Sequence, residues 1–238
     1  IFRTLGCKYN PARKDALCPL PAGYQSYSDC LGPSEHLRAH VFGIYKAGAG
    51  DSARLFALVT SLPDNVPGSG PWACGVRVGG IQYRLVDGRW QMESANLVVT
   101  EDGTYGAMGG DVRFARVGTE RYGVIIGGDY MNHGVTGVHA QLIAVHGGRL
   151  LRLGGAGYQT SDATTMLRCR DGISTSTGSW RLDTTSGGEF YDVIVEHGAE
   201  VCENFDTNAK RIVSPAWTER LVFSGDEYKS NNPHDGDE

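Results

Sequence analysis

Long hydrophobic runs are missing from this chain of 238 residues. No apolar stretch approaches the roughly 18–20 residues that a membrane-spanning helix requires. A sustained apolar period of 3.6 residues is missing as well, so we expect little helix. The sequence therefore predicts no transmembrane segment.

Positive charge is also scarce. Lys and Arg number 22 against 27 Asp and Glu, which gives a formal net charge of −5. Aromatic residues make up only 9% of the chain, and they form no stripe alternating with basic residues. Nucleic acids and anionic membranes attract basic surfaces, so both are poor candidates for the main partner. We expect no nucleic-acid partner.

Several short motifs of enzymes and metal sites are absent. The chain has no C-x-x-C pair, no G-x-S-x-G nucleophile elbow, and no glycine-rich loop followed by the lysine of a phosphate-binding loop. Gly50-Asp51-Ser52 faintly resembles the GDS strings of serine hydrolases, but Asp and Ser are also common turn residues. We therefore predict no catalytic residue, no metal ligand and no cofactor, although distant residues can still form a catalytic pocket.

Cysteine is present in an even number, at wide and irregular spacing. The six residues are Cys7, Cys18, Cys30, Cys74, Cys169 and Cys202. This pattern favours disulfides and hence an oxidising compartment, the periplasm or the exterior, over buried thiols in a cytosolic protein. We expect Cys169 to pair with Cys202 and the other four to pair among themselves. Because the chain begins with Ile1, we also expect a processed or trimmed chain.

Glycine is the residue in excess, with 34 copies, about twice the usual share of roughly 7%. Gly-Gly and Asp-Gly pairs separate short runs rich in β-branched and aromatic residues, as in tight hairpins. The predicted turns are Gly79-Gly80, Asp87-Gly88, Asp102-Gly103, Gly118-Thr119 and Gly147-Gly148. The fold predicted is all-β, an antiparallel meander that forms a sandwich or a barrel; a small irregular propeller is a third alternative.

The domain organisation follows from composition. Residues 1–34 hold four prolines and three cysteines, so we expect an irregular, disulfide-bonded segment, with one helical turn near Pro11–Leu17. Residues 35–225 are expected to form a single all-β domain. Residues 226–238 are polar and acidic and are expected to form a flexible tail.

One end of the predicted meander is the candidate binding face. Connections in an up-and-down sheet alternate between its two ends. The tight turns at 102–103, 118–119 and 147–148 then fall at one end, and longer loops at 108–111, 128–137 and 154–162 fall at the other. Long loops on a rigid sheet commonly carry binding residues. The predicted binding residues are Met108, Asp129, Tyr130, Met131, Asn132, His133, Tyr158 and Gln159.

A resemblance adds to this prediction. The run Arg121–Tyr130, the Gly-Val-Thr-Gly stretch at 134–137, and the strands around Trp180 and at 191–195 resemble a pattern in exported, largely uncharacterised β-proteins of Gram-negative bacteria. Some of those proteins are of the immunity or lysozyme-inhibitor type. The resemblance implies a periplasmic binding protein with no chemistry of its own.

The function we expect is therefore that of a non-enzymatic, exported protein that binds and blocks another protein, such as a secreted toxin or a cell-wall hydrolase. Two alternatives stay open. One is a secreted hydrolase that acts on a cell-wall or carbohydrate substrate, and the other is a ligand-binding surface module.

Overall fold

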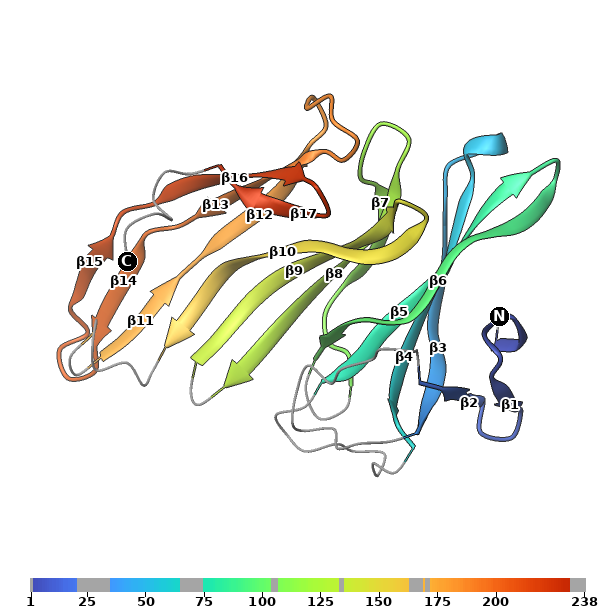
Figure 1. Cartoon of the computed structure of the whole chain (residues 1–238). Helices are drawn as coiled ribbons and strands as arrows, with labels where there is room; N and C mark the ends of the chain where they lie inside the picture. The colour runs from blue at the N-terminus through green and yellow to red at the C-terminus, as the bar shows by residue number, and fades with distance from the viewer. Residues whose placement is uncertain are drawn as a thin grey trace. The chain divides into compact units, whose positions relative to one another are not determined.

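The computed structural model describes residues 2–20, 35–64, 75–103, 107–132, 135–162, 169 and 172–231 (Figure 1). Within these ranges the chain forms antiparallel strands and two short 3₁₀ helices, η1 (Phe2–Leu5) and η2 (Gly50–Ser52), and no α-helix. The predictions of an all-β fold and of low helix content are confirmed. No helix in the described ranges is long and apolar enough to cross a membrane.

The first sheet is a meander of six strands in chain order. Its strands are β1 (Lys8–Asn10), β2 (Asp15–Pro19), β3 (His36–Ala47), β4 (Arg54–Pro63), β5 (Val76–Val86) and β6 (Arg89–Asp102). Each strand pairs antiparallel with the next, so the predicted meander is confirmed for this sheet.

A seven-stranded sheet has the order β15-β14-β11-β10-β9-β8-β7. Its strands are β7 (Val112–Arg116), β8 (Tyr122–Asn132), β9 (Val135–His146), β10 (Arg149–Asp162), β11 (Gly172–Ser176), β14 (Glu200–Asn204) and β15 (Lys210–Ser214). A four-stranded sheet holds β12 (Gly178–Asp183), β13 (Asp192–His197), β16 (Trp217–Ser224) and β17 (Glu227–Ser230), in that order. The sheets are not closed into a barrel.

The chain groups into two compact units. Unit 1 holds residues 1–116, 122–126 and 143–152, and unit 2 holds residues 117–121, 127–142 and 153–238. Strands β8, β9 and β10 therefore contribute residues to both units. Residues 35–225, for which we expected a single domain, are divided between the two units.

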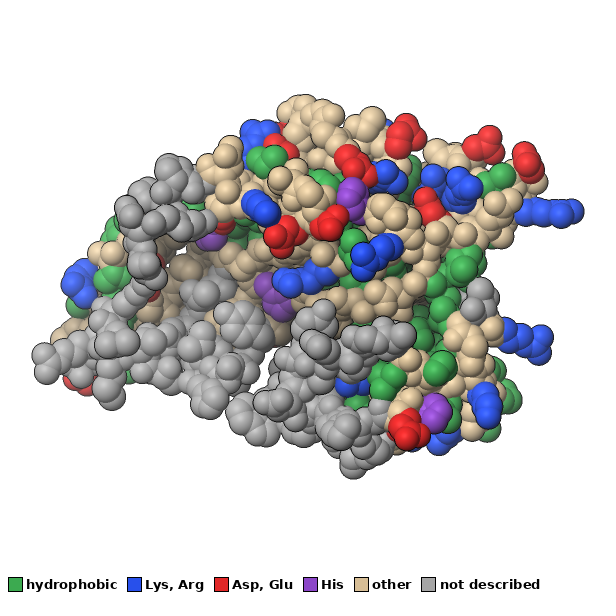
Figure 2. All heavy atoms as spheres, viewed as in Figure 1, with side chains coloured by type: hydrophobic (Ala, Val, Ile, Leu, Met, Phe, Trp, Pro, Cys, Tyr) green, Lys and Arg blue, Asp and Glu red, His purple; other side chains and the backbone are tan. Residues whose placement is uncertain are grey.

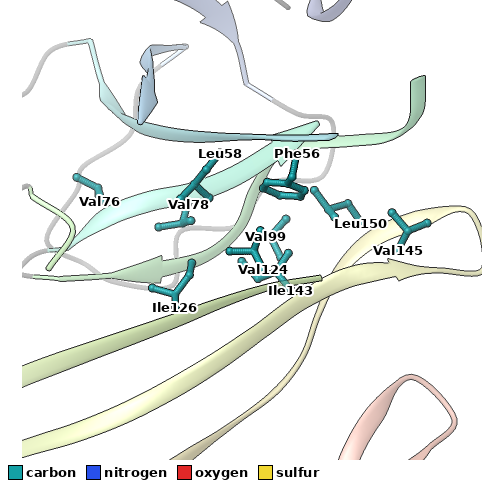
Figure 3. Close-up of a cluster of buried hydrophobic side chains, with 10 residues drawn as sticks. All are labelled: Phe56, Leu58, Val76, Val78, Val99, Val124, Ile126, Ile143, Val145 and Leu150. Carbon is teal, nitrogen blue, oxygen red and sulfur yellow. The ribbon is translucent and has the colours of Figure 1, made fainter. Parts of the chain in front are cut away.

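The main core of unit 1 lies between two sheets (Figure 3). One side comes from β4, β5 and β6 and the other from β8, β9 and β10, so this unit has the two-layered packing of a β-sandwich. Its buried residues are Phe56, Leu58, Val76, Val78, Val99, Val124, Ile126, Ile143, Val145 and Leu150. Alternation along each strand places these side chains on one face.

A second cluster in unit 1 is formed by the N-terminal segment. Phe2, Cys7, Ala16 and Cys18 pack with residues of β3, β4 and β6, among them Val59. Residues 2–20 are more regular than expected, because β1 and β2 pair with each other and β2 pairs with β3. In the region 11–17, where we expected a helical turn, residues 11–14 form the turn between β1 and β2, and residues 15–17 belong to β2.

Two disulfides lie in the described chain. Cys7 bonds to Cys18, and Cys169 bonds to Cys202. The second pairing is the one predicted, and the first agrees with pairing among the remaining four cysteines. Cys30 and Cys74 lie outside the described residues.

The core of unit 2 joins the four-stranded sheet to strand β10. Ala156, Val193, Val195 and Leu221 are buried there. Tyr158, Trp180, Leu182 and Tyr228 are partly buried and pack against this cluster. The inward-facing residues alternate along β12, β13 and β16, as expected for a sheet with one covered face.

Two of the predicted turns are confirmed as hairpins by their backbone. Asp87-Gly88 joins β5 to β6, and Gly147-Gly148 joins β9 to β10. All four residues have positive φ, between 50° and 76°. This conformation is the one that a two-residue turn matching the twist of its strands requires.

One other predicted turn is wrong. Gly79-Gly80 lies inside the continuous strand β5. A Cβ added to Gly79 would lie 2.3 Å from the carbonyl oxygen of Asn96, so this glycine serves the close approach of β6 rather than a turn. The prediction at Asp102-Gly103 is not tested, because residues 104–106 of its expected second strand lie outside the described residues; Gly103 itself has a φ of 78°.

The connection between β7 and β8 packs against the backbone of another segment of unit 2. The amide of Tyr191 donates to the carbonyl of Val117, and a Cβ added to Gly118 would lie 2.0 Å from the carbonyl oxygen of Glu189. We expect Gly118→Ala to lower the free energy of unfolding by about 1–3 kcal/mol, because the backbone must move apart. Urea denaturation measures this effect.

The matched control for this substitution is Gly157→Ala. A Cβ at Gly157 would meet no heavy atom within 4 Å, and its φ is not positive. We expect this change to alter stability by less than about 0.5 kcal/mol. Equal losses from the two variants would contradict the role assigned to the close approach at Gly118.

The expected flexible tail, 226–238, begins as a strand. Residues Glu227–Ser230 form β17 and pair with β16, with Phe223 opposite Tyr228. The prediction for residues 232–238 falls outside the described residues.

Candidate functional site

The long loops predicted at 128–137 and 154–162 are strands wherever the structure describes them. Residues 128–132 belong to β8, residues 135–137 to β9, and residues 154–162 to β10. The glycines that suggested loops lie within these strands. A Cβ added to Gly154, whose φ is 158°, would lie 3.1 Å from the Tyr228 side chain. The predictions of loops at 128–137 and 154–162 are therefore wrong where the structure describes these residues, whereas residues 108–111 are a loop as predicted.

The predicted binding residues fall in different places. Met108 is half-buried in unit 1 and packs against the core. In unit 2, Asp129 is exposed on β8, and Tyr158 on β10 packs against the buried cluster. Tyr130, Met131 and Asn132 lie at the end of β8 and Gln159 lies on β10; His133 is outside the described residues.

Topology brings most of these residues into one region of unit 2. Strands β8 and β10 both flank β9 in the sheet. In an antiparallel arrangement the ends of β8 and β10 both lie beside the start of β9. Tyr130, Met131, Asn132 and Gln159 are therefore near one another along the sheet, whereas Met108 belongs to unit 1.

Unit 1 carries an apolar surface that the sequence analysis missed. Lys46 is opposite Leu55, Leu55 is opposite Tyr83, and Tyr83 is opposite Met92 in the registers of β3 to β6. Residues directly opposite across strands project from the same face. Because Leu55 is adjacent to the core residue Phe56, this face points away from the sandwich core.

Further apolar residues extend the same face along the strands. Ile44 precedes Lys46 by two positions on β3 and therefore projects from the same face. Towards the hairpin, the next pair on this face after Tyr83 and Met92 is Leu85 with Trp90. We call Ile44, Leu55, Tyr83, Leu85, Trp90 and Met92 the apolar face of β3–β6. Ile44 is 58% exposed, Met92 48% and Trp90 39%. Burial among these neighbours raises the pKa of the Tyr83 phenol.

The described part of the N-terminal segment, residues 2–20, covers one part of the outer side of this sheet. Val59, which lies on the same side of β4 as Leu55, is fully buried against that segment. Towards the β5–β6 hairpin the side chains are exposed, and the Lys46 ammonium lies 6.0 Å from the centroid of the Trp90 ring. The apolar face is thus the uncovered continuation of a surface whose other part is buried.

A sequence signal for this face was present. Asp87-Gly88 forms a two-residue turn with Val86 opposite Arg89, so counting outward pairs Leu85 with Trp90. Four large apolar side chains at alternating positions around a hairpin indicate one apolar surface. The hairpin was predicted, but its register was not used.

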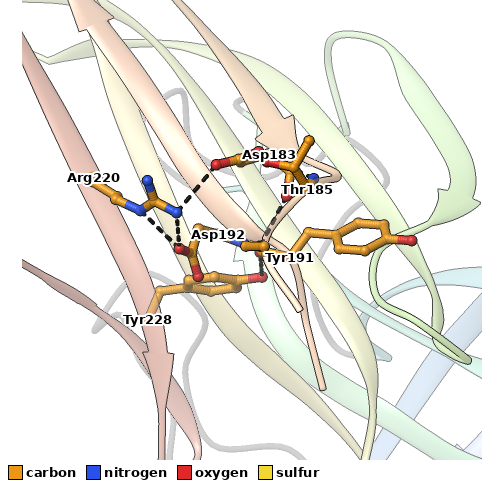
Figure 4. A network of polar contacts seen from close by, with 7 residues as sticks. Asp183, Thr185, Tyr191, Asp192, Arg220 and Tyr228 are labelled. Carbon is orange, nitrogen blue, oxygen red and sulfur yellow. Dashed lines mark hydrogen bonds and ion pairs between the residues drawn. The ribbon is translucent and has the colours of Figure 1, made fainter. Parts of the chain in front are cut away.

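Unit 2 holds a polar network on the four-stranded sheet (Figure 4). The Arg220 guanidinium donates to Asp192 through Nε, at 2.8 Å, and to Asp183 through Nη2, at 3.1 Å. Hydrogen bonds from Thr185 lower the pKa of Asp183, and the hydrogen bond to Asp192 raises the pKa of Arg220. The network joins β12, β13 and β16, so its role is to hold the sheet together.

Tyr228 ties β17 to this region. Its hydroxyl donates to the carbonyl oxygen of Tyr191 at 2.6 Å, and burial, helped by the negative charge of Asp192, raises its pKa. The fold therefore keeps a proton that the unfolded chain loses above about pH 10, so stability falls as the pH rises beyond that value. We expect Tyr228→Phe to reduce this alkaline loss and to cost about 1 kcal/mol at neutral pH.

Urea denaturation between about pH 7 and pH 11 tests this prediction. The pKa of Tyr83 is also raised by burial, so Tyr83→Phe serves as the comparison for a more exposed phenol. A Tyr228→Phe variant whose stability fell with pH as steeply as that of the wild type would contradict the prediction.

Charges of both signs are interspersed over the face drawn in Figure 2, and its described part shows no large area of one sign. Among the residues that the structure describes, no group of three or more His, Cys, Asp or Glu side chains is placed to hold a metal ion. The comparisons with known proteins add nothing to this picture: no family model, no curated protein and no solved structure matches the chain. The fold defines an all-β protein of open antiparallel sheets with disulfides.

Proposed function

We propose that this chain is a non-enzymatic binding protein that recognises and blocks another protein through the apolar face of β3–β6. The single observation that supports this proposal is the exposure of Ile44, Trp90 and Met92 on one continuous face. Monomeric proteins rarely leave large contiguous apolar areas open to water, and such areas commonly mark interaction sites.

The composition of the face favours a protein as the occupant. Trp, Tyr and Met are enriched at the centres of protein interfaces, where large side chains are buried with little loss of conformational entropy. Lys46 beside Trp90 provides a single positive charge at the margin. A partner with an exposed apolar patch and an acidic residue at its edge fits this arrangement.

Export to the periplasm or the exterior is part of the proposal. The Cys7–Cys18 and Cys169–Cys202 bonds support an oxidising compartment, since cytosolic thiols are kept reduced. The resemblance to immunity proteins and lysozyme inhibitors makes a secreted toxin or a cell-wall hydrolase the first partner class to test.

The experiment uses the disulfide-bonded protein as bait in an extract of cells that carry its gene. Retained protein is identified, purified and titrated against the wild type, Trp90→Ala with Met92→Ser, and the control Trp217→Ala. We expect the double variant to weaken binding at least about tenfold, or about 1.4 kcal/mol, with the control unchanged. Inhibition of the purified partner, where it is a hydrolase or toxin, then measures blocking.

Two results would overturn the proposal. One is binding of the purified partner that does not change in the double variant. The other is a dimer of this chain in solution that dissociates with the same substitutions, because the face would then be occupied by a second copy. Light scattering of the purified protein measures the oligomeric state.

A further inference from the structure

A second surface, in unit 2, combines an aromatic ring with two polar side chains. His197 is directly opposite Trp217 in the pairing of β13 with β16. Their rings stack with centroids 3.9 Å apart and an angle of 9° between planes. Trp217 is 43% exposed, so part of the indole is open to solvent.

Glu219 completes the group. It follows Trp217 by two positions on β16 and therefore projects from the same face. Its Oε2 lies 3.2 Å from Nε2 of His197. The side chains of His197 and Glu219 are only 20% and 17% exposed, so both polar groups are held in place beside the more open indole.

The position of this group in the sheet explains its partial exposure. Val193 and Val195 share its face and are buried in the core of unit 2. Next to His197 in the sheet is Gly178, and a Cβ added there would lie 2.2 Å from the carbonyl oxygen of Tyr158. The face is thus closed near β12 and opens towards β16, where Trp217 lies.

We propose that Trp217, His197 and Glu219 form a binding site for a neutral sugar ring. A pyranose has an apolar C–H surface that packs on an indole and hydroxyl groups at its edge that pair with a carboxylate and an imidazole. Apolar surface with a few fixed polar groups is the usual composition of a small-molecule site. This inference is independent of the proposed function, because it concerns other residues, in unit 2, and another class of ligand.

Other ligands fit this group less well. A hydrocarbon would cover the carboxylate of Glu219 without offering it a hydrogen bond, which costs free energy. A cationic ligand would meet the Glu219 carboxylate, but it would compete for that carboxylate with the imidazole of His197, which already hydrogen-bonds to it. A sugar offers donors and acceptors to both groups, and nucleic acid is disfavoured by the net charge of −5.

The test titrates the intact, disulfide-bonded protein with chitotetraose, cellotetraose and tetramethylammonium, followed by calorimetry and tryptophan fluorescence. We expect at least one of the two saccharides to bind with a Kd of about 1 mM or tighter. Trp217→Ala should raise that Kd at least about tenfold, and Glu219→Gln should raise it while keeping the shape of the side chain. Phe205→Ala, which changes another exposed aromatic residue outside both proposed sites, should leave it unchanged.

Urea denaturation of each variant separates loss of binding from loss of folding. No binding of either saccharide at about 10 mM would overturn the proposal, as would binding that Trp217→Ala leaves intact. Binding of tetramethylammonium alone would also overturn it and would assign the site to cations. Failure of the protein-partner experiment at Trp90 and Met92 has no bearing on these outcomes, so the two proposals are judged separately.

Discussion

Replacement of Phe56 by alanine is expected to lower the free energy of unfolding by about 3–5 kcal/mol. Phe56 is fully buried in the core of unit 1, and its ring lies against Gly80, where an added Cβ would be 2.4 Å from its Cζ. Its ring also lies 5.8 Å from that of Phe114, centroid to centroid. Alanine would leave a cavity between two sheets. Each sheet is held in place by the pairing of its strands, so the surrounding side chains can move little to fill the cavity.

Phe42→Ala is the matched control. Phe42 lies on β3 and is 46% exposed. We expect its removal to cost less than about 1 kcal/mol. Urea denaturation of both variants provides the comparison, and a Phe56→Ala loss as small as that of Phe42→Ala would show that this core repacks around the missing ring.

Removal of the Cys169–Cys202 disulfide is expected to have an effect of similar size. The bond joins residues separated by 33 positions, and both cysteines are buried. In the chain-entropy treatment, a cross-link that closes a loop of this length lowers the entropy of the unfolded chain and stabilises the fold by about 4 kcal/mol. The double variant Cys169→Ala with Cys202→Ala, denatured in urea without reductant, measures this loss.

The other described disulfide serves as an internal standard. Cys7 and Cys18 are separated by 11 positions, for which the same treatment predicts about 3 kcal/mol. Cys7→Ala with Cys18→Ala should therefore destabilise the protein less than the first pair does. The opposite order would mean that interactions of the folded state, rather than loop length, determine the contribution of these bonds.

Hairpins with local signals could be predicted from the sequence, whereas long-range pairings could not. Asp87-Gly88 requires only that two adjacent residues adopt positive φ, and this requirement is visible in the residue types. Gly79-Gly80 has equally suggestive residues, but there the missing side chain of Gly79 admits the backbone of β6, and that of Gly80 admits the Phe56 ring of β4. The same residue type thus answers two physical needs, and only the tertiary structure distinguishes them.

The candidate sites follow the same division. The apolar face of β3–β6 could have been derived in part, since Leu85 and Trp90 are paired by a predicted turn. The stacking of His197 on Trp217 could not, because β13 and β16 are separated in the chain by β14 and β15, which belong to another sheet. No local sequence pattern predicts that β13 and β16 pair when two strands of another sheet separate them in the chain.

The division of strands between the units also constrains how this protein can have been assembled in evolution. Domains are exchanged between genes most simply as uninterrupted stretches of sequence with their own core. The shortest uninterrupted stretch that contains all of unit 1 runs from residue 1 to residue 152, and it carries residues 117–121 and 127–142 of unit 2 with it. No single crossover separates the two units with both complete, so we expect the two to be inherited together.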